Sequence, residues 1–170
     1  VGGLSLGGYV SLKFFEKHKA MVKALILCDT GPGFRNPERM QEWNNQRLDI
    51  AQYLEAQGIE AFANSRYVGT TNYTSKETML KHNPLGLSRA NRGYMQNTYA
   101  IDVLPTVDVP TLVLCGEGDK AFRFAADYMQ ERIKGSEKVI IPNAGHAANV
   151  DQPQAFNRAV MDFLREKVRA

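Results

Sequence analysis

The sequence is short of cysteine and histidine, and both shortages exclude kinds of site. Its only cysteines, Cys28 and Cys115, each lie in an apolar run typical of a buried strand. We therefore expect two reduced core thiols, not a disulfide or a thiolate metal site, and a cytoplasmic location. The three histidines are scattered along 170 residues and do not form a zinc-binding pattern, so no metal is expected.

Long apolar runs and long basic runs are also missing. No stretch approaches the roughly 18 apolar residues of a membrane span, and no basic start precedes an apolar signal segment. The 21 basic and 18 acidic residues are mixed along the chain and give a net charge of +3. We therefore expect neither nucleic acid nor a membrane as partner. The glycines around Ser5 lack the Gly-Lys-Ser/Thr ending of a phosphate-binding loop, and no cofactor is expected.

What the sequence does contain is an alternation of strand and helix patterns. A hydrophobic content of 44% suits a globular protein with a buried core. Apolar residues recur at four-residue spacing in the first predicted helix. The predicted helices and strands lie before and after a middle block, residues 34–100, whose pattern is helical and aromatic. The predicted helices are Leu6–His18, Ala121–Ile133 and Gln154–Val168, and the strands are Ala24–Cys28, Thr111–Cys115 and Lys138–Ile141. This order predicts an α/β fold with parallel strands, crossover helices and an inserted helical block.

A candidate nucleophile lies almost at the start of the sequence. Gly3-Leu4-Ser5-Leu6-Gly7 matches Gly-x-Ser-x-Gly, whose small residues allow a sharp turn that holds the serine hydroxyl clear of the backbone. Chance alone produces this pattern in about one chain in twenty of this length, so a glycine-rich turn with an incidental serine is the alternative. The context favours the nucleophile, because a strand end precedes Ser5 and a helix follows it at once.

A serine nucleophile needs a base, and His146 is the best placed of the three histidines. It follows the last predicted strand, and catalytic groups in open α/β sheets gather at the carboxyl ends of strands. His18 ends the first helix among lysines, where helix capping is the better interpretation. His82 precedes Asn83-Pro84 and is interpreted as a surface residue.

The base in turn needs a carboxylate on its other ring nitrogen. Asp119 lies just past the carboxyl end of the preceding strand, with Glu117 as the alternative acid and a plain acidic turn as the non-functional interpretation. Asp102 and Asp108 precede that strand and Asp127 lies within the following helix, so these three fit less well.

The order of these three residues resembles that of the α/β-hydrolase superfamily. Ser5, Asp119 and His146 follow one another as nucleophile, acid and histidine, each after its own strand. Residues 109–116 and the tripeptide Ala144-Gly145-His146 are similar to that family's approaches to its acid and histidine. Within the superfamily the chain most resembles small hydrolases with a helical cap, which include esterases, enol-lactonases, carbon–carbon bond hydrolases and cofactor-free perhydrolases.

The resemblance implies a hydrolase core of residues 1–33 and 101–170, with residues 34–100 as a helical cap. It implies attack by Ser5 on a small ester, lactone or related carbonyl substrate, an acyl-enzyme intermediate, and an oxyanion hole that includes the backbone N–H of Leu6. Four cap aromatics would supply a substrate pocket, although packing within the cap is the alternative role for each: Phe34, Trp43, Tyr67 and Tyr94.

Other functions and one structural departure stay open. The same triad serves carbon–carbon hydrolases and perhydrolases, and the fold also occurs in binding proteins without activity. The family has further strands and a second oxyanion donor before its nucleophile, and the chain opens at Val1 without an initiator methionine. We therefore expect an unpaired sheet edge beside the Ala24–Cys28 strand, covered by a separate N-terminal segment or by a second copy, and activity of this chain alone is left open.

Overall fold

A computed structural model describes residues 1–69 and 74–168 of the chain. The chain forms two compact units, one of Val1–Gly33 with Ala100–Ala170 and one of Phe34–Tyr99. The first unit contains a parallel sheet with helices, and the second is helical. Among the residues described, no helix is both long enough and apolar enough to cross a membrane.

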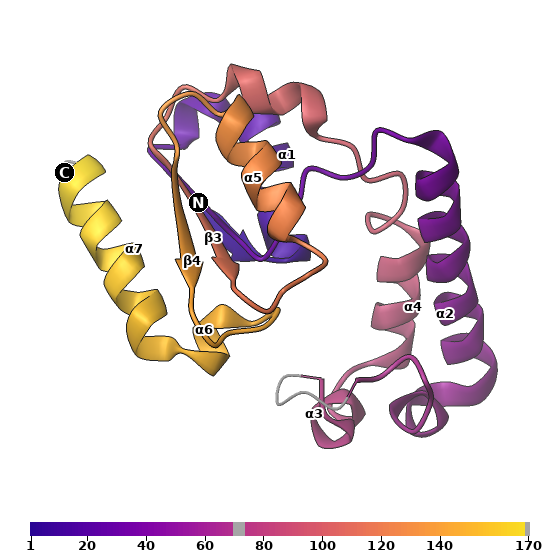
Figure 1. Ribbon diagram of the computed structural model, residues 1–170. Helices are drawn as coiled ribbons and strands as arrows, with labels where there is room; N and C mark the ends of the chain where they lie inside the picture. Colours follow the sequence, from indigo (N-terminus) through magenta and orange to yellow (C-terminus); the bar gives the residue numbers. More distant parts are fainter. Residues whose placement is uncertain (70–73, 169–170) are drawn as a thin grey trace. The chain divides into compact units, whose positions relative to one another are not determined.

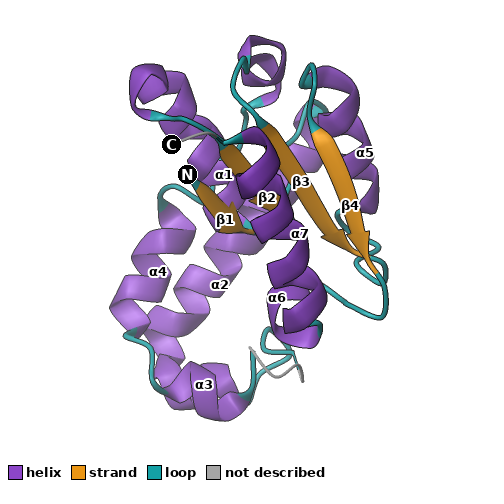
Figure 2. Ribbon diagram, turned by 90° about the vertical axis from the view of Figure 1, so that its left-hand side faces the viewer, coloured by secondary structure: helices purple, strands orange, loops and turns teal. Residues whose placement is uncertain are grey.

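Four parallel strands form the sheet of the first unit, in the order β1-β2-β3-β4. The arrowheads of all four point the same way, so the carboxyl ends share one edge (Figure 2). All six residues of β3 are buried, as expected for a continuous apolar strand covered on both faces. The strands are β1 (Gly2–Leu4), β2 (Leu25–Cys28), β3 (Thr111–Gly116) and β4 (Glu137–Ile141).

The expected unpaired edge beside the Ala24–Cys28 strand is wrong. The strand β2 pairs on both sides, because β1 aligns Gly2 with Ile26 and Gly3 with Leu27. The outer strands of the described sheet are instead β1 and β4. The residues before Ser5 fit as a full strand because glycine lets the backbones approach closely: a Cβ added at Gly2 would lie 2.7 Å from the carbonyl oxygen of Ile26.

Helices cover both faces of this sheet (Figure 1). On one face, α1 (Leu6–His18), α5 (Arg123–Arg132) and the 3-10 segment η2 (Ile101–Thr106) enclose a core centred on Leu12, Leu27 and Val113. On the other, Phe163 of α7 (Pro153–Lys167) joins a core with residues of β2, β3 and β4, among them Cys28, Leu112 and Ile141. Two short elements were not predicted, the 3-10 segment η1 (Lys19–Met21) and α6 (Ala148–Asp151).

The helical unit consists of α2 (Pro37–Ala63), α3 (Lys76–Leu80) and α4 (Pro84–Arg92). Each helix begins at a residue whose side chain caps it, since Asn36, Ser75 and Asn83 accept hydrogen bonds from backbone N–H groups three residues later. Glu55 of α2 accepts hydrogen bonds from Ser88 and Arg92 of α4. The bonds from Arg92, and then that from Ser88, lower the pKa of Glu55 to about 2, so the carboxylate stays ionised at acidic pH values at which an ordinary glutamate is protonated.

The two motif glycines differ in the space around them, which yields a testable prediction. A Cβ at Gly3 would lie 2.4 Å from the carbonyl carbon of Gly7, whereas a Cβ at Gly7 would meet no described atom within 4 Å. We expect Gly3→Ala to lower the free energy of unfolding by about 1–3 kcal/mol, because backbone must shift to admit the methyl group. Urea unfolding followed by circular dichroism measures the change.

Gly7→Ala is the matched control, and it should leave the stability unchanged or raise it by up to about 1 kcal/mol, since alanine favours a helix. Equal losses in the two variants would contradict the account of this turn.

Candidate active site

Ser5 alone forms the turn between β1 and α1. Its backbone has φ 53° and ψ −116°, a conformation that costs a non-glycine residue roughly 1–3 kcal/mol. The N–H of Ser5 donates to the carbonyl oxygen of Cys28 at 2.9 Å, and its own carbonyl accepts from Gly8 at 3.0 Å. The turn is thereby fixed on both sides by β2 and by the first turn of α1.

The three predicted catalytic residues lie within hydrogen-bonding distance of one another. His146 Nε2 is 2.9 Å from Ser5 Oγ, and His146 Nδ1 is 2.8 Å from Asp119 Oδ2. Ser5 follows β1, Asp119 follows β3 and His146 follows β4, so the three come together because parallel strands end at the same edge. The contacts span 141 residues of sequence between Ser5 and His146, and 27 between Asp119 and His146.

The surroundings determine which imidazole nitrogen carries the proton. The side chain of Asp119 is 4% exposed and that of His146 is 29% exposed. An ionised carboxylate can only accept, so the neutral imidazole carries its hydrogen on Nδ1 and donates it to Asp119. The lone pair of Nε2 then faces the Ser5 hydroxyl, which is the arrangement a general base requires.

Phe122 and Asp151 help to fix the position of the imidazole, and neither was identified from the sequence. The ring of Phe122 stacks on that of His146, with centroids 5.0 Å apart and planes inclined by 22°. The N–H of Gly145 donates to Asp151 Oδ2 at 2.7 Å, which ties the loop before His146 to the end of α6. Phe122 lies three residues after Asp119, near the start of the predicted helix Ala121–Ile133. No pattern in the neighbouring sequence distinguishes it from an ordinary core residue.

The alternative residues lie elsewhere. The carboxylate of Glu117 is exposed and accepts from the N–H of Asn143 at 3.3 Å, so its partner is backbone and not the imidazole. Asp108 pairs with Lys19 and Asp127 pairs with Lys138. Of the other histidines, His18 and His82 are both exposed.

The four aromatics predicted to bind substrate do not form one group. Phe34 and Trp43 lie together, with ring centroids 5.7 Å apart, and line a hollow of about 390 Å³ in the helical unit. Tyr67 packs with Phe62 and other residues inside that unit, while Tyr94 is 60% exposed. Only the first pair therefore offers a shared apolar surface.

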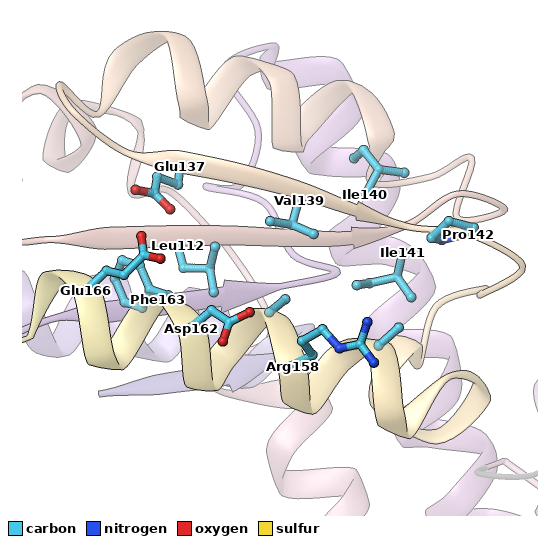
Figure 3. A pocket seen from close by; sticks show the side chains of 12 residues that line it. Leu112, Glu137, Val139, Ile140, Ile141, Pro142, Arg158, Asp162, Phe163 and Glu166 are labelled. Carbon is cyan, nitrogen blue, oxygen red and sulfur yellow. The ribbon is translucent and has the colours of Figure 1, made fainter.

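Another hollow, of about 350 Å³, lies between β4 and α7 (Figure 3). Its floor is apolar, with Leu112, Val139 and Phe163, and its rim carries charged groups such as Glu137 and Arg158. None of Ser5, Asp119 and His146 lines it. The hollow therefore brings together neither a nucleophile nor a base, and it is not a candidate for the reaction site.

In the described part of the chain, one group of side chains has the spacing of metal ligands. The ligand atoms of Asp29, Cys115 and Asp119 lie within 4.8 Å of one another. Burial raises the pKa of the Cys115 thiol to about 12, so the sulfur stays protonated at neutral pH, and the carboxylates already accept from N–H groups and His146. Because all three side chains are buried and the carboxylate oxygens already accept these hydrogen bonds, a metal ion would have to displace the bonds that hold the site together, and this group is a poor metal site.

Comparison with known proteins gives a consistent result. The model of a family described as "Alpha/beta hydrolase family" matches residues 1–159. The chain is 27% identical over 175 residues to a putative 2-succinyl-6-hydroxy-2,4-cyclohexadiene-1-carboxylate synthase of Bacillus subtilis, a match that covers 95% of this chain and 64% of the relative. The chain thus spans somewhat less than two thirds of that relative's length.

Two solved structures have the same fold. MenH from S. aureus superposes with a TM-score of 0.89 at 26% identity, covering 99% of this chain and 68% of that one. A thermophilic esterase from Thermogutta terrifontis superposes with a TM-score of 0.84 at 29% identity, covering 99% of this chain and 65% of that one. These matches confirm the fold class predicted from the sequence.

The buried thiols give a prediction that concerns the interior next to Asp119. Burial, with the neighbouring Asp29 as a further cause, raises the pKa of Cys28 well above its usual value and that of Cys115 to about 12. Because thiolates form only as the pH rises through the raised pKa, the native protein should resist iodoacetamide between about pH 8 and 10. The urea-unfolded chain should gain two adducts under the same conditions. Mass spectrometry of the intact chain measures both, and rapid alkylation of the native protein would contradict the burial of these thiols.

Proposed function

The chain belongs to the α/β-hydrolase family, and we propose that it is a serine hydrolase that cleaves a small ester, lactone or related carbonyl compound through an acyl-enzyme. One observation carries the proposal: Ser5, His146 and Asp119 form a continuous chain of hydrogen bonds at the carboxyl ends of three parallel strands. Nucleophile, base and orienting acid are the groups that acyl transfer requires.

The geometry supports a two-step reaction. His146 Nε2 takes the proton of the Ser5 hydroxyl as Oγ attacks the carbonyl carbon, and the same nitrogen then delivers that proton to the leaving group. Asp119 stabilises the imidazolium that forms between these events, because its buried carboxylate accepts the Nδ1–H. Water activated by His146 hydrolyses the acyl-enzyme and restores Ser5.

The oxyanion needs donors placed beside the nucleophile. Leu6 is the first residue of α1, and the first N–H groups of a helix have no acceptor within the helix. The Leu6 N–H is therefore proposed as one oxyanion donor. In enzymes where one such donor was removed, the rate fell by about 100- to 1,000-fold.

The helical unit is proposed as the substrate-binding cap. Its hollow supports this role, since small-molecule sites combine apolar walls with polar groups. Here the rings of Phe34 and Trp43 lie beside the polar side chains of Arg39, Glu42 and Gln46. Arg47 lies over the Trp43 ring, with its guanidinium carbon 4.1 Å from the centroid, and adds a positive charge beside this surface.

A second candidate is the reaction named for the Bacillus subtilis relative, formation of a cyclohexadiene carboxylate. The match to that relative covers 95% of this chain at 27% identity, which supports this candidate. A 2-hydroxy-6-oxo-6-(2'-aminophenyl)hexa-2,4-dienoic acid hydrolase of Metapseudomonas resinovorans matches 97% of this chain at the same identity, so carbon–carbon bond hydrolysis stays a candidate as well. Profiling with p-nitrophenyl esters, lactones and that synthase's substrate separates the candidates. Turnover of the last alone would overturn the esterase proposal.

Single substitutions in the full-length protein test the proposed roles. We expect Ser5→Ala and His146→Ala to abolish hydrolysis of p-nitrophenyl acetate. Asp119→Asn should lower kcat by about 10⁴-fold, because the amide NH₂ can donate to Nδ1 and hold the imidazole in the wrong tautomer. Initial rates of p-nitrophenolate release measure each effect.

Glu117→Gln is the matched control, since Glu117 lies in the same loop and its carboxylate accepts a backbone N–H, that of Asn143. This variant should keep kcat within about threefold of the parent protein. A large loss in Glu117→Gln together with a small one in Asp119→Asn would show that the acid was assigned to the wrong residue.

A further inference from the structure

Asp29 and Thr30, the two residues that follow β2, are buried polar residues for which the proposed reaction has no use. Asp29 has no exposed surface and Thr30 is 2% exposed. The strand β2 lies between β1 and β3, so this dipeptide stands between the turn of Ser5 and the loop of Asp119. Asp29 also has a backbone φ of 43°, which few non-glycine residues adopt.

Thr30 forms a hydrogen bond to the backbone of Ser5. Its hydroxyl donates to the carbonyl oxygen of Ser5 at 2.6 Å. Its side chain also lies against the first turn of α1, because a Cβ added at Gly8 would come within 2.4 Å of the Thr30 methyl carbon. Thr30 therefore limits the position of Ser5 from the side of β2.

Asp29 bonds to the loops of the other two catalytic residues. Its Oδ1 accepts the N–H of Gly116 at 2.7 Å, three residues before Asp119. Its Oδ2 accepts the N–H of Ala148 at 3.2 Å, two residues after His146, and the thiol of Cys28 at the same distance. A single buried carboxylate thus joins the acid loop to the histidine loop.

We propose that Asp29 and Thr30 are a positioning pair that sets the mutual placement of Ser5, Asp119 and His146. This inference rests on the proposed function, because positioning matters only if these three residues react. The pair contacts all three catalytic segments and none of the reacting atoms. Since displacements of about 1 Å can cost about 100-fold in rate, fixing these loops is a sufficient role for two buried polar groups.

The threonine allows a conservative test by isosteric change. In the full-length protein, Thr30→Val removes the hydroxyl and keeps the shape, and we expect kcat for p-nitrophenyl acetate to fall about tenfold with KM within about twofold. Thr30→Ser keeps the hydroxyl and should restore kcat to within about threefold of the parent protein.

Thr111→Val is the matched control. Thr111 is also a buried threonine whose hydroxyl donates to a backbone carbonyl, that of Val109 at 3.0 Å, but it lies at the opposite end of the sheet. Its loss should affect stability as much as Thr30→Val does and leave kcat unchanged. Equal effects of the two valine variants on kcat would reduce Thr30 to a structural residue and overturn the proposal.

The aspartate is tested by Asp29→Asn, which replaces one of its two accepting oxygens with an NH₂ group. The variant therefore loses one of the two bonds, either that from Gly116 or that from Ala148. We expect kcat to fall about 100-fold. The low-field proton NMR signal of the His146 Nδ1–H, which reports its bond to Asp119, should shift or broaden while the melting transition stays cooperative.

The outcomes separate this inference from the proposed function. If Ser5→Ala is inactive while folded Asp29→Asn and Thr30→Val keep full kcat and an unchanged Nδ1–H signal, the positioning role is wrong and the proposed function stands. If Ser5→Ala keeps its activity, the proposed function fails. Should Asp29→Asn fail to fold, the Thr30 variants and their Thr111 control still decide the question.

Discussion

The turn at Ser5 is the constraint on which the rest of the site depends. One residue with positive φ must reverse the chain between β1 and α1, and this places the helix directly against the strand it follows. Side chains cannot fit there, since a Cβ at Gly3 would enter the backbone of Gly7 and one at Gly8 would enter Thr30. The cost of this backbone is offset by hydrogen bonds from the neighbouring strand and helix, and the result is a hydroxyl that meets the imidazole of His146.

The parallel sheet brings the other two residues of the proposed triad to the turn of Ser5. Because its strands are parallel, the loops after β1, β3 and β4 end at one edge and bring together residues far apart in the sequence. The remaining strand, β2, carries no residue of the proposed triad, but the two residues that follow it, Asp29 and Thr30, form hydrogen bonds to the segments of all three. Each strand of the described sheet thus has a part in the candidate site: three are followed by a residue of the proposed triad, and β2 is followed by the proposed positioning pair.

The parts that could be predicted from the sequence were those with local signals. The glycines around Ser5, and the short loops that carry Asp119 and His146, are recognisable from neighbouring residues, and so are most helices and strands. The bonds of Asp29 could not be predicted, because they join it to residues 87 and 119 positions away, and an aspartate after a strand looks like any turn residue. For a related reason, Phe122 was missed, and Tyr67 was left with two possible roles, substrate binding or packing within the cap. Whether an aromatic ring stacks on an imidazole or packs in a hydrophobic core depends on tertiary structure.

The central claim is that Ser5 is a nucleophile activated by His146. Treatment of the full-length protein with a fluorophosphonate, followed by mass spectrometry of its peptides, tests this claim without knowledge of the substrate. The account predicts one adduct per chain, on the peptide that contains Ser5, and none in a folded His146→Ala variant over the same time. Absence of an adduct in the active-site peptide, or equal labelling in that variant, would contradict it.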